Sequence, residues 1–302
     1  MNKQSSYRTG YITILGRPNV GKSTLLNGLL GRKLSITSRK PQTTRNKILG
    51  IKTNAEHQMI YLDTPGIHSQ KNRKNKLNAQ MNKTALRSIQ DVDVILFVVS
   101  GVNWTIEDDL ILQKLQAAPS PIILVINKID LIFPKERILD HINNIKNKHP
   151  FAAIIPLAAK RPSTLDPLET LIKQYLPLGP QLFSSALHTD RDDKFLLAEL
   201  LREKLIRYLG DELPYSLFIT IDHSADDGKN IQKIIATIHV EKQGQKKIII
   251  GENGKVLKKL GTLARKDMEK YLNKKVFLQL WVKIKNNWTK NEKILASLGY
   301  EI

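Results

Sequence analysis

The chain of 302 residues is long enough for two domains that each bury their own core, and it carries 48 Lys and Arg residues against 28 Asp and Glu, a formal net charge of +20. Such an excess of positive charge favours a partner rich in phosphate, which means a nucleic acid, a nucleotide or an anionic membrane surface. The absence of cysteine excludes disulfides, thiolate metal sites and cysteine nucleophiles, and no apolar stretch reaches the length of a transmembrane helix, so we expect a cytoplasmic protein, at most peripheral at the inner face of the cell membrane.

In the first part of the chain, short β-branched runs alternate with segments of helical period. The runs cover residues 11–16, 57–66, 92–100, 121–128 and 152–160. This alternation predicts an α/β domain over residues 8–178, with a mostly parallel sheet and helices on both faces. The pattern stops in residues 179–192, where Pro, Gly, Ser and acidic residues fit neither a strand nor a helix, and we place a linker there.

The remainder, residues 193–302, predicts a small α+β domain. Apolar residues at helical spacing follow Asp193 and stop at Gly210, which suits a helix C-terminus. Two alternating strands, "YSLFITIDH" and "KIIATIHVEK", come next. Two helical segments around Gly251 and a last strand, "KVFLQLWVKI", complete the order helix, strand, strand, helix, helix, strand.

The stretch "GRPNVGKST" begins at Gly16, directly after an apolar strand, and opens onto a segment with helical character. That context is the one a phosphate-binding P-loop needs. Its glycines let backbone N–H groups surround phosphates, and the helix N-terminus favours negative charge. Lys22 then reaches the β- and γ-phosphates, and Ser23 can bind Mg²⁺. The alternative is a Gly-rich turn without a ligand, which the later motifs disfavour.

Two further motifs follow apolar strands. In "DTPG", Asp63 can hold Mg²⁺ through water and the Gly66 N–H can contact the γ-phosphate, although this sequence is also ordinary turn chemistry. In "NKID", Asp130 can accept hydrogen bonds from guanine N1–H and N2–H₂, whereas adenine would leave the carboxylate desolvated and unpaired. The sequence therefore predicts a site for GTP rather than ATP.

Together with "SITSRKPQTTR" and "LDTPGIH", these motifs resemble the Era family of ribosome-assembly GTPases, within the translation-factor-related class, and the resemblance spans both parts of the chain. It implies that Thr44 closes switch I on Mg²⁺, with Thr43 as the competing residue. It also implies that the loop "PLAAK" reaches the base, with the Ala159 N–H facing guanine O6. The family usually has Ser where this chain has Ala158, so we expect a modest weakening of guanine binding.

The expected ligands of the nucleotide are Gly16, Arg17, Pro18, Asn19, Val20, Gly21, Lys22, Ser23, Thr24, Asp63, Thr64, Pro65, Gly66, Asn127, Lys128, Asp130, Ala158, Ala159 and Lys160. The expected ligands of Mg²⁺ are Ser23, Thr44 and Asp63. The residues expected to act in hydrolysis are Asn19, Lys22, Thr44 and Gly66.

The residue after "DTPG" is Ile67, whose hydrocarbon side chain cannot orient water as a Gln does in a Ras-type GTPase. The resemblance implies a substitute, because relatives with an apolar residue here and Asn in the P-loop can place K⁺ against the β- and γ-phosphates. Asn19 matches that Asn. We hypothesise slow hydrolysis that K⁺ stimulates. The alternative is that Asn19 is only a tolerant turn residue, in which case K⁺ and Na⁺ would give equal rates.

In the second part, a Gly-x-x-Gly turn resembles the loop of type II KH domains, which clamps the backbone of about four single-stranded nucleotides. The motif alone is weak evidence for RNA binding. Residues 241–285, however, contain 13 Lys and Arg residues against 4 acidic ones, and such a concentration of positive charge around the loop favours binding of RNA phosphates. The expected RNA contacts are Lys246, Lys247, Ile250, Gly251, Glu252, Asn253, Gly254, Lys255, Lys258 and Lys259. For Ile248, Ile249 and Ile250 the core is the favoured place, with Ile250 the best exception. For Trp281 and Trp288, base stacking is open, but a core or surface-anchor role is favoured.

The resemblance implies a monomeric GTPase that binds the 3′ end of 16S rRNA through its KH domain and acts in assembly of the 30S ribosomal subunit, with a loose peripheral association with the membrane. The residues alone indicate guanine nucleotide, Mg²⁺ and RNA, but not which RNA. Two alternatives stay open: a membrane-surface adaptor that uses GTP as a conformational signal, and a GTPase that acts on another single-stranded nucleic acid. The basic segment 71–83 follows "DTPG" and is expected to be switch II and to couple the two functions.

Overall fold

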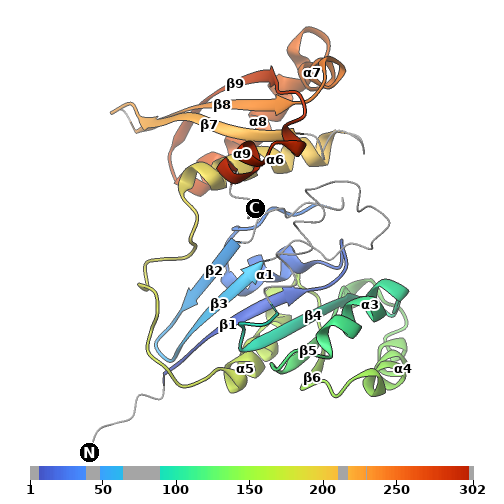
Figure 1. The fold of residues 1–302 in the computed structure, drawn as a ribbon. Coiled ribbons are helices and arrows are strands. Elements are labelled where there is room, and N and C mark those ends of the chain that lie inside the picture. The colour runs from blue at the N-terminus through green and yellow to red at the C-terminus, as the bar shows by residue number, and fades with distance from the viewer. Residues whose placement is uncertain (1–6, 39–47, 64–88, 210–216, 229, 299–302) are drawn as a thin grey trace, which may run out of the picture. The chain divides into compact units, whose positions relative to one another are not determined.

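The computed structural model of the chain is shown in Figure 1 and describes residues 7–38, 48–63, 89–209, 217–228 and 230–298. Its contacts divide the chain into two units. The first joins Met1–Ser35 with Thr44–Asp190, and the second joins Ile36–Thr43 with Arg191–Ile302. Among the helices so described, none is long and apolar enough to cross a membrane.

The first unit is built on a six-stranded sheet of order β2-β3-β1-β4-β5-β6. Its strands are β1 Arg8–Leu15, β2 Ile48–Thr53, β3 His57–Asp63, β4 Val94–Ser100, β5 Ile122–Asn127 and β6 Ala153–Pro156. All neighbouring strands are parallel except β2, which runs antiparallel to β3. β4 and β5 are buried almost throughout, because helices cover both faces of the sheet.

Four α-helices of this unit lie in the described part of the chain: α1 Lys22–Leu30, α3 Ile106–Leu115, α4 Glu136–Ile145 and α5 Asp166–Tyr175. Alternate residues of β4, such as Phe97, pack against α3 and α4 in one continuous core. Helices α1 and α5 cover the opposite face (Figure 1). Short 3₁₀ turns, η2 Ile129–Leu131 and η4 Pro162–Thr164, follow β5 and β6. The predicted α/β architecture is therefore confirmed.

The five predicted strands of this unit are all present, each a few residues shorter or shifted at its ends. β2 was not predicted from the sequence. Its apolar residues Ile48 and Ile51 are buried and pair with β3. Leu26 and Leu30 of α1 would lie 3.2 Å and 2.6 Å from a Cβ added at Gly50, so this glycine lets the helix approach the edge strand closely.

The segment expected as a linker, residues 179–192, lies along the first unit as far as Asp190. The Gln58 side chain accepts hydrogen bonds from the Leu182 and Phe183 N–H groups, both at 2.9 Å, and Thr189 forms an isolated bridge with Gly50. The Ile51 N–H donates to the His188 carbonyl at 2.9 Å. Backbone groups of the segment are thus paired with the domain surface, which explains how it is ordered without a helix or a strand of its own.

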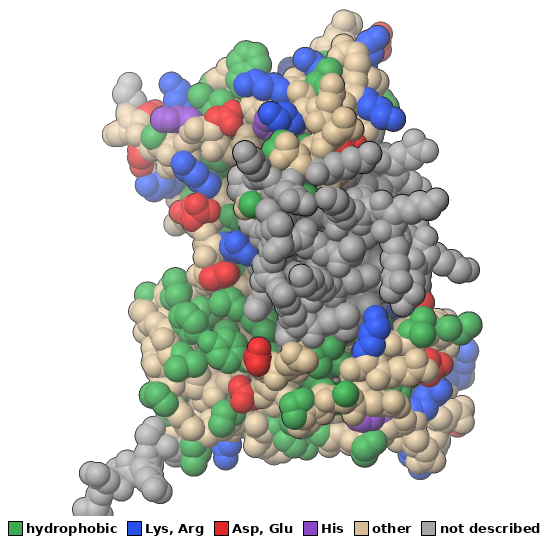
Figure 2. Space-filling model, viewed as in Figure 1, with side chains coloured by type: hydrophobic (Ala, Val, Ile, Leu, Met, Phe, Trp, Pro, Cys, Tyr) green, Lys and Arg blue, Asp and Glu red, His purple; other side chains and the backbone are tan. Residues whose placement is uncertain are grey.

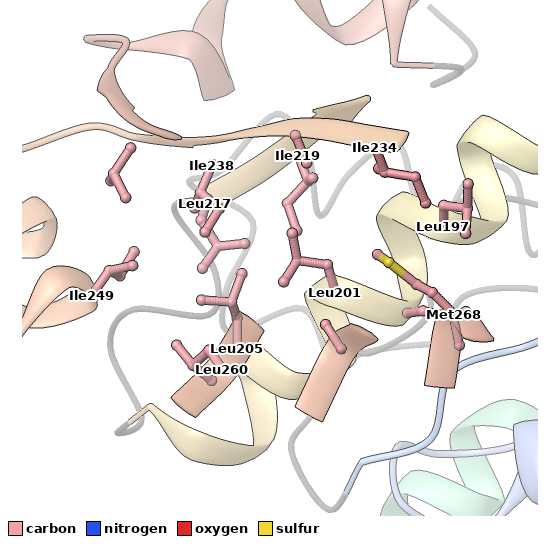
Figure 3. Packing of buried hydrophobic residues seen from close by; sticks show 14 of the residues in the cluster. Leu197, Leu201, Leu205, Leu217, Ile219, Ile234, Ile238, Ile249, Leu260 and Met268 are labelled. Carbon is pink, nitrogen blue, oxygen red and sulfur yellow. The ribbon is translucent and has the colours of Figure 1, made fainter. Parts of the chain in front are cut away.

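The second unit has the predicted order of elements, α6 Asp193–Tyr208, β7 Leu217–Asp226, β8 Ile231–Val240, α7 Gln243–Ile250, α8 Lys255–Leu272 and β9 Lys275–Ile284. The sheet order is β7-β8-β9, with β7 antiparallel and β9 parallel to β8. In Figure 3, Leu197, Leu201 and Leu205 of α6 point toward the apolar side chains of β7 and β8. Asp192 caps α6 by accepting from the Phe195 N–H at 2.8 Å. This is an α+β domain with the element order of a type II KH domain.

Residues 36–38 also belong to the second unit. The Thr37 N–H and hydroxyl donate to the Glu203 carboxylate of α6 at 3.1 and 3.2 Å. Arg207 donates to the Thr37 carbonyl at 2.9 Å and to its hydroxyl at 2.8 Å. Glu203 is fully buried and is paired with Arg207 at 2.7 Å. Thr37 is therefore held by side chains of α6 within the second unit.

Some predictions concern residues outside the described ranges. They are the Mg²⁺ ligand Thr44 and its competitor Thr43, the residues Thr64, Pro65, Gly66 and Ile67 of the "DTPGI" motif, the basic segment 71–83, and the helix end at Gly210. α6 itself ends at Tyr208, with Leu209 as its C-cap.

Candidate nucleotide and RNA sites

The predicted nucleotide motifs lie at one edge of the six-stranded sheet. The P-loop follows β1, Asp63 ends β3, Asn127 ends β5 and the "PLAAK" loop follows β6, so all are at carboxyl ends of parallel strands. β1 lies between β3 and β4, which is where the strand order reverses. Open α/β sheets bind ligands at this position, because adjacent loops diverge there and leave a crevice.

Backbone geometry explains the glycines of the P-loop. Gly16 and Gly21 have φ of 150° and 104°. A Cβ at Gly16 would lie 2.3 Å from the Val98 carbonyl oxygen, and one at Gly21 would lie 2.3 Å from Asn127 Nδ2. Any side chain would therefore push the loop off β4 and β5. Asn19 has φ of 65°, in the left-handed region that Asn tolerates, and its side chain is exposed.

Lys22 begins α1, and its ammonium group points back into the loop. It donates to the carbonyl oxygens of Gly16 at 3.0 Å and Arg17 at 2.9 Å. Burial lowers the pKa of Lys22 to about 8, while the Asp63 carboxylate opposes this shift. A phosphate bound in the loop would stabilise the charged ammonium form of Lys22, which burial disfavours. The position of Lys22 therefore suits the binding of an anion.

Two hydroxyl groups meet the Asp63 carboxylate at the end of β3. Ser23 donates to Asp63 Oδ2 at 3.3 Å, and Ser35 donates to the same oxygen. Asn27 of α1 fixes Ser35, because Asn27 Oδ1 accepts from the Ser35 N–H at 2.9 Å and Nδ2 donates to its carbonyl at 2.7 Å. The structure thus brings together Ser23 and Asp63, two of the three predicted Mg²⁺ ligands. Their oxygen atoms are the kind of donor that Mg²⁺ prefers. Ser35 was not predicted.

Asn127 connects the P-loop to the base-binding loop. Its Nδ2 donates to the Val20 carbonyl at 2.8 Å, and its Oδ1 accepts from the Ala159 N–H at 2.9 Å and the Lys128 N–H at 2.7 Å. Lys128 donates to the Asn19 carbonyl at 2.5 Å. The Ala159 N–H, which was expected to face guanine O6, is directed at Asn127 in this structure. Asp130 lies in η2 and is half-exposed.

A hydroxyl group that the motif analysis missed lies in the base-binding loop. Thr164 Oγ1 of η4 lies 2.9 Å from the Ala158 carbonyl oxygen and 2.8 Å from the Arg161 carbonyl oxygen, which share its one hydroxyl proton, and it accepts from the Ala158 N–H at 3.3 Å. It therefore braces the loop at the position where the family usually has Ser. Thr164 is six residues beyond Ala158, so no short motif could have indicated it.

Asp108 is a second missed residue. Its carboxylate, fully buried, binds the Arg17 guanidinium at 3.1 Å. The same carboxylate accepts from the Thr105 N–H at 3.0 Å in a capping box at the start of α3. The first turn of α3 thus holds the P-loop residue Arg17. The sequence "TIED", residues 105–108, has the pattern of a capping box and could have indicated the start of α3 at this position.

The predicted RNA loop joins α7 to α8. Gly251 and Gly254 have φ of 70° and 76°, and Asn253 between them has φ of 49°. A Cβ at Gly251 would lie 2.4 Å from Val256 Cγ2, whereas nothing lies within 4 Å of one at Gly254. The turn is therefore tight on its inner side and open at Gly254, where the N-terminus of α8 also favours an anion.

The predicted lysines of this loop are not equivalent. Lys247, Lys255 and Lys258 are exposed, while Lys246 is half-buried. Lys259 lies over the Tyr208 ring, 4.8 Å from its centroid. Figure 2 shows Lys and Arg side chains on the face of the second unit seen there. Of the isoleucines, Ile249 is in the core and Ile248 is 53% exposed, so Ile248 rather than the half-buried Ile250 is the most exposed of the three.

A P-loop, a carboxylate at the end of β3 and an Asn-Lys-x-Asp motif on a doubly wound sheet, followed by a KH-type domain, define a guanine-nucleotide-binding protein with an RNA-binding module. Two family matches agree: residues 11–128 match the family described as 50S ribosome-binding GTPase, and residues 212–289 match the KH domain.

Relatives of full length give a more specific assignment. The chain is 49% identical over 300 residues to GTPase Era of Pseudomonas savastanoi pv. phaseolicola and 46% identical to that of Glaesserella parasuis, with 99% of both chains covered. A crystal structure of Era in complex with MgGDPNP and nucleotides 1506–1542 of 16S ribosomal RNA matches with a TM-score of 0.92 and 39% identity, over 98% of this chain and 100% of that one. A variant of Aquifex aeolicus Era bound to GDP.AlF4⁻ matches with the same TM-score, at 40% identity. This chain belongs to the Era family of GTPases.

Proposed function

We propose that this GTPase binds the 3′ end of 16S rRNA through its KH domain and acts in assembly of the 30S ribosomal subunit, with slow hydrolysis of GTP as the timer. The observation that carries the proposal is the match over 98% of the chain to Era in complex with MgGDPNP and 16S rRNA nucleotides 1506–1542. The Gly251–Gly254 turn, which is open at Gly254, supports it, because phosphates must come within contact of the main chain there.

In the nucleotide site, Lys22 would contact the β- and γ-phosphates, and Asn127 and Asp130 would hold the base. Ser23 and Asp63, 3.3 Å apart, would hold Mg²⁺, Asp63 through water, with Thr44 as the third proposed ligand. The metal ion supplies positive charge that offsets the charge developing on the phosphate oxygens. The buried position of Lys22 strengthens its attraction for those oxygens, because little water competes.

We also propose that K⁺ at Asn19 assists hydrolysis, since Ile67 cannot orient water. The test compares single-turnover rates in K⁺ and Na⁺ for the wild type and for Asn19→Gly. Glycine preserves the left-handed backbone at this position and removes only the amide side chain. Faster hydrolysis in K⁺ that disappears in Asn19→Gly supports the proposal. Equal rates in K⁺ and Na⁺ for the wild type would refute it and leave Asn19 as a turn residue.

RNA binding is tested with the fragment that spans nucleotides 1506–1542 of 16S rRNA, at fixed salt, with GDPNP and then with GDP. Tight binding of this RNA, lost on charge reversal of Lys255 and Lys258, is expected. A tenfold preference for the GDPNP state corresponds to about 1.4 kcal/mol of coupling between the two sites. Failure to bind in either state would overturn the proposed RNA function.

The protein is proposed to act as a monomer in the cytoplasm and to associate loosely with the inner face of the membrane, through the attraction of its positive charge to anionic lipids. Sedimentation with vesicles of neutral and of anionic lipids tests this part. Binding that requires the anionic lipid and falls with salt is expected, whereas equal absence from both vesicles would contradict it. Sedimentation velocity of the free protein measures its molecular mass in solution, which should be that of one chain if the protein is a monomer.

A further inference from the structure

Two large aromatic side chains are exposed on the last strand of the second unit. Phe277 and Trp281 of β9 are 54% and 52% exposed. Their neighbours Val276, Leu278 and Val282 pack into the core under the helices. Because side chains alternate along a strand, Phe277 and Trp281 both lie on the opposite, outer face of the sheet. β9 is an edge strand of the three-stranded sheet, so both rings lie at the border of that face.

The register of the sheet shows what surrounds the two rings. Phe277 lies opposite Lys233 of β8, and Trp281 lies opposite Thr237. Gln279, between the rings, lies opposite Ile235. The rings are four residues apart, which is about 13 Å along a strand, so each ring is available to a different planar group.

Aromatic side chains cover one end of this outer face. Trp288, which is buried, contacts the Phe218 ring of β7 edge to face at 4.8 Å between centroids. Phe218 in turn stacks on His239 of β8 at 4.3 Å. These three rings close the end of the face where β8 finishes. The part that carries Phe277, Gln279 and Trp281 stays exposed.

The open part of the face is basic. Lys233 and Lys275 lie on the same face of the sheet as the two rings, and both are exposed. Lys283, also exposed, lies opposite His239 at the border of the covered end. The acidic side chain of Asp222, on β7, accepts hydrogen bonds from the hydroxyls of Thr220 and Thr237. A protein-binding face would have few charges at its centre. Exposed rings between lysines match the bases and phosphates of a single-stranded nucleic acid instead.

We propose that the outer face of the β7-β8-β9 sheet is a second RNA-binding surface, on which bases of single-stranded RNA stack on Phe277 and Trp281 while lysines contact the phosphates. The proposal rests on the proposed RNA function. It concerns a different place, because α7 and α8, which carry the Gly251–Gly254 turn, pack on the inner face of the sheet through Ile249, Leu260 and Met268. RNA that leaves the turn and passes around the β9 edge would reach both rings.

The test measures binding of two RNAs, at fixed salt and with GDPNP: the 1506–1542 fragment, and an oligonucleotide of about six nucleotides that can occupy only the turn. Phe277→Ala together with Trp281→Ala should weaken binding of the long fragment at least tenfold and leave the short oligonucleotide unchanged. Charge reversal of Lys255 and Lys258 should weaken both. If the double variant binds the long fragment as the wild type does, the second surface does not exist.

Two controls distinguish base stacking from a general loss of affinity and from self-association. Phe133, 86% exposed in the first unit, can be changed to Ala to show whether loss of any exposed ring lowers RNA affinity. Sedimentation velocity of the double variant tests self-association: if the variant changes oligomeric state while its RNA affinity stays at the wild-type value, the face is a contact between protein copies and the proposal is wrong. Failure of the wild type to bind either RNA would instead overturn the proposed function itself.

Stacking also has a direct spectroscopic signature. The chain has three tryptophans, of which Trp288 is buried and Trp104 half-buried, so Trp281 is the one available to a base. Long RNA should quench its fluorescence, and Trp281→Phe should remove the quenching while keeping affinity within a few fold, because phenylalanine retains a stacking ring. Unchanged quenching in Trp281→Phe would show that RNA does not contact this ring.

Discussion

The Nδ2 atom of Asn127 lies 2.8 Å from the carbonyl oxygen of Val20, so the "NKID" motif is hydrogen-bonded to the P-loop across 107 residues of chain. The Oδ1 atom of the same side chain accepts from the Ala159 N–H at 2.9 Å. Three loops that must act on one nucleotide are thus held by one buried amide. This arrangement makes the position of each loop depend on the other two.

Asn127→Ala removes these hydrogen bonds and leaves the buried Val20 carbonyl and Ala159 N–H without this partner. Each such loss costs about 1 to 3 kcal/mol of stability in the loops. The nucleotide must then order loops that the amide no longer fixes, so GDP affinity is expected to fall at least about tenfold. Titration calorimetry with GDP measures the change. Asn144→Ala, an exposed position on α4, is the matched control and should leave affinity unchanged. An Asn127→Ala protein with wild-type affinity would show that the bridge has no role in binding.

Asp130→Ala is expected to reduce selectivity for guanine. Asp130 is half-exposed, so its removal should not change the free energy of unfolding, but it deletes the acceptor for the guanine N1–H and N2–H₂ groups. Competition of GDP with ADP measures the selectivity, which should fall at least tenfold in the variant. A selectivity equal to that of the wild type would place the guanine acceptor elsewhere.

Thr164 is expected to support guanine binding without touching the base. Thr164→Ala removes the hydroxyl that donates its proton to the loop carbonyls and accepts from the Ala158 N–H, and affinity for GDP should fall severalfold. Thr164→Ser keeps the hydroxyl and should restore most of the loss. If Ser and Ala behave alike, the hydroxyl is not the group that matters.

The two glycines of the RNA turn should respond differently to alanine. Gly251→Ala adds a Cβ 2.4 Å from Val256 Cγ2 to a strained backbone, so it should destabilise the second unit by more than about 1 kcal/mol. Gly254→Ala incurs only the cost of a positive φ, about 1 kcal/mol. Urea unfolding followed by circular dichroism measures both. Equal effects of the two substitutions would contradict the crowding seen at Gly251.

Glu203→Ala is expected to be destabilising, because it deletes a buried carboxylate that binds Arg207 and accepts hydrogen bonds from the N–H and the hydroxyl of Thr37. Arg207 is 49% exposed, so water can take over part of its hydrogen bonding, and the loss of the carboxylate and its hydrogen bonds should cost about 2 to 3 kcal/mol in the free energy of unfolding. Thr37→Val removes only the hydroxyl and should cost about 1 kcal/mol. Urea unfolding of both variants, followed by circular dichroism, gives the two costs. A cost below about 1 kcal/mol for Glu203→Ala would show that the segment 36–38 is not held by α6.

The nucleotide motifs could be predicted because their function depends on local spacing. Gly16 to Ser23 form one continuous turn, and the strands before them have the apolar alternation that a buried parallel sheet requires. The residues that brace the site could not be predicted in this way. These residues act through contacts that depend on how the loops meet at the sheet edge. Ser35 contacts Asp63, 28 positions away, Asp108 contacts Arg17, 91 positions away, and Thr164 contacts Ala158, 6 positions away.

The second unit shows the same division. The order of its elements and the Gly-x-x-Gly turn were visible in the pattern of apolar residues and glycines. Ile248 is more exposed than Ile250 because of the way α7 is rotated about its axis against the sheet. The spacing of residues in one short helix does not determine that rotation. The burial of Trp288 and the exposure of Trp281 follow from which end of the outer face is covered.

The sequence by itself determined the class of the protein, the order of its domains and the identity of the nucleotide, because each rests on residues that are neighbours in the chain. The tertiary structure alone decided which distant residues hold those motifs in place and which faces remain open. Asn127 is hydrogen-bonded to Val20, and Glu203 is hydrogen-bonded to Thr37. Phe277 and Trp281 remain exposed. All three observations have the same physical cause. Contacts and exposure depend on how helices and strands pack, and packing brings together residues that no local pattern relates.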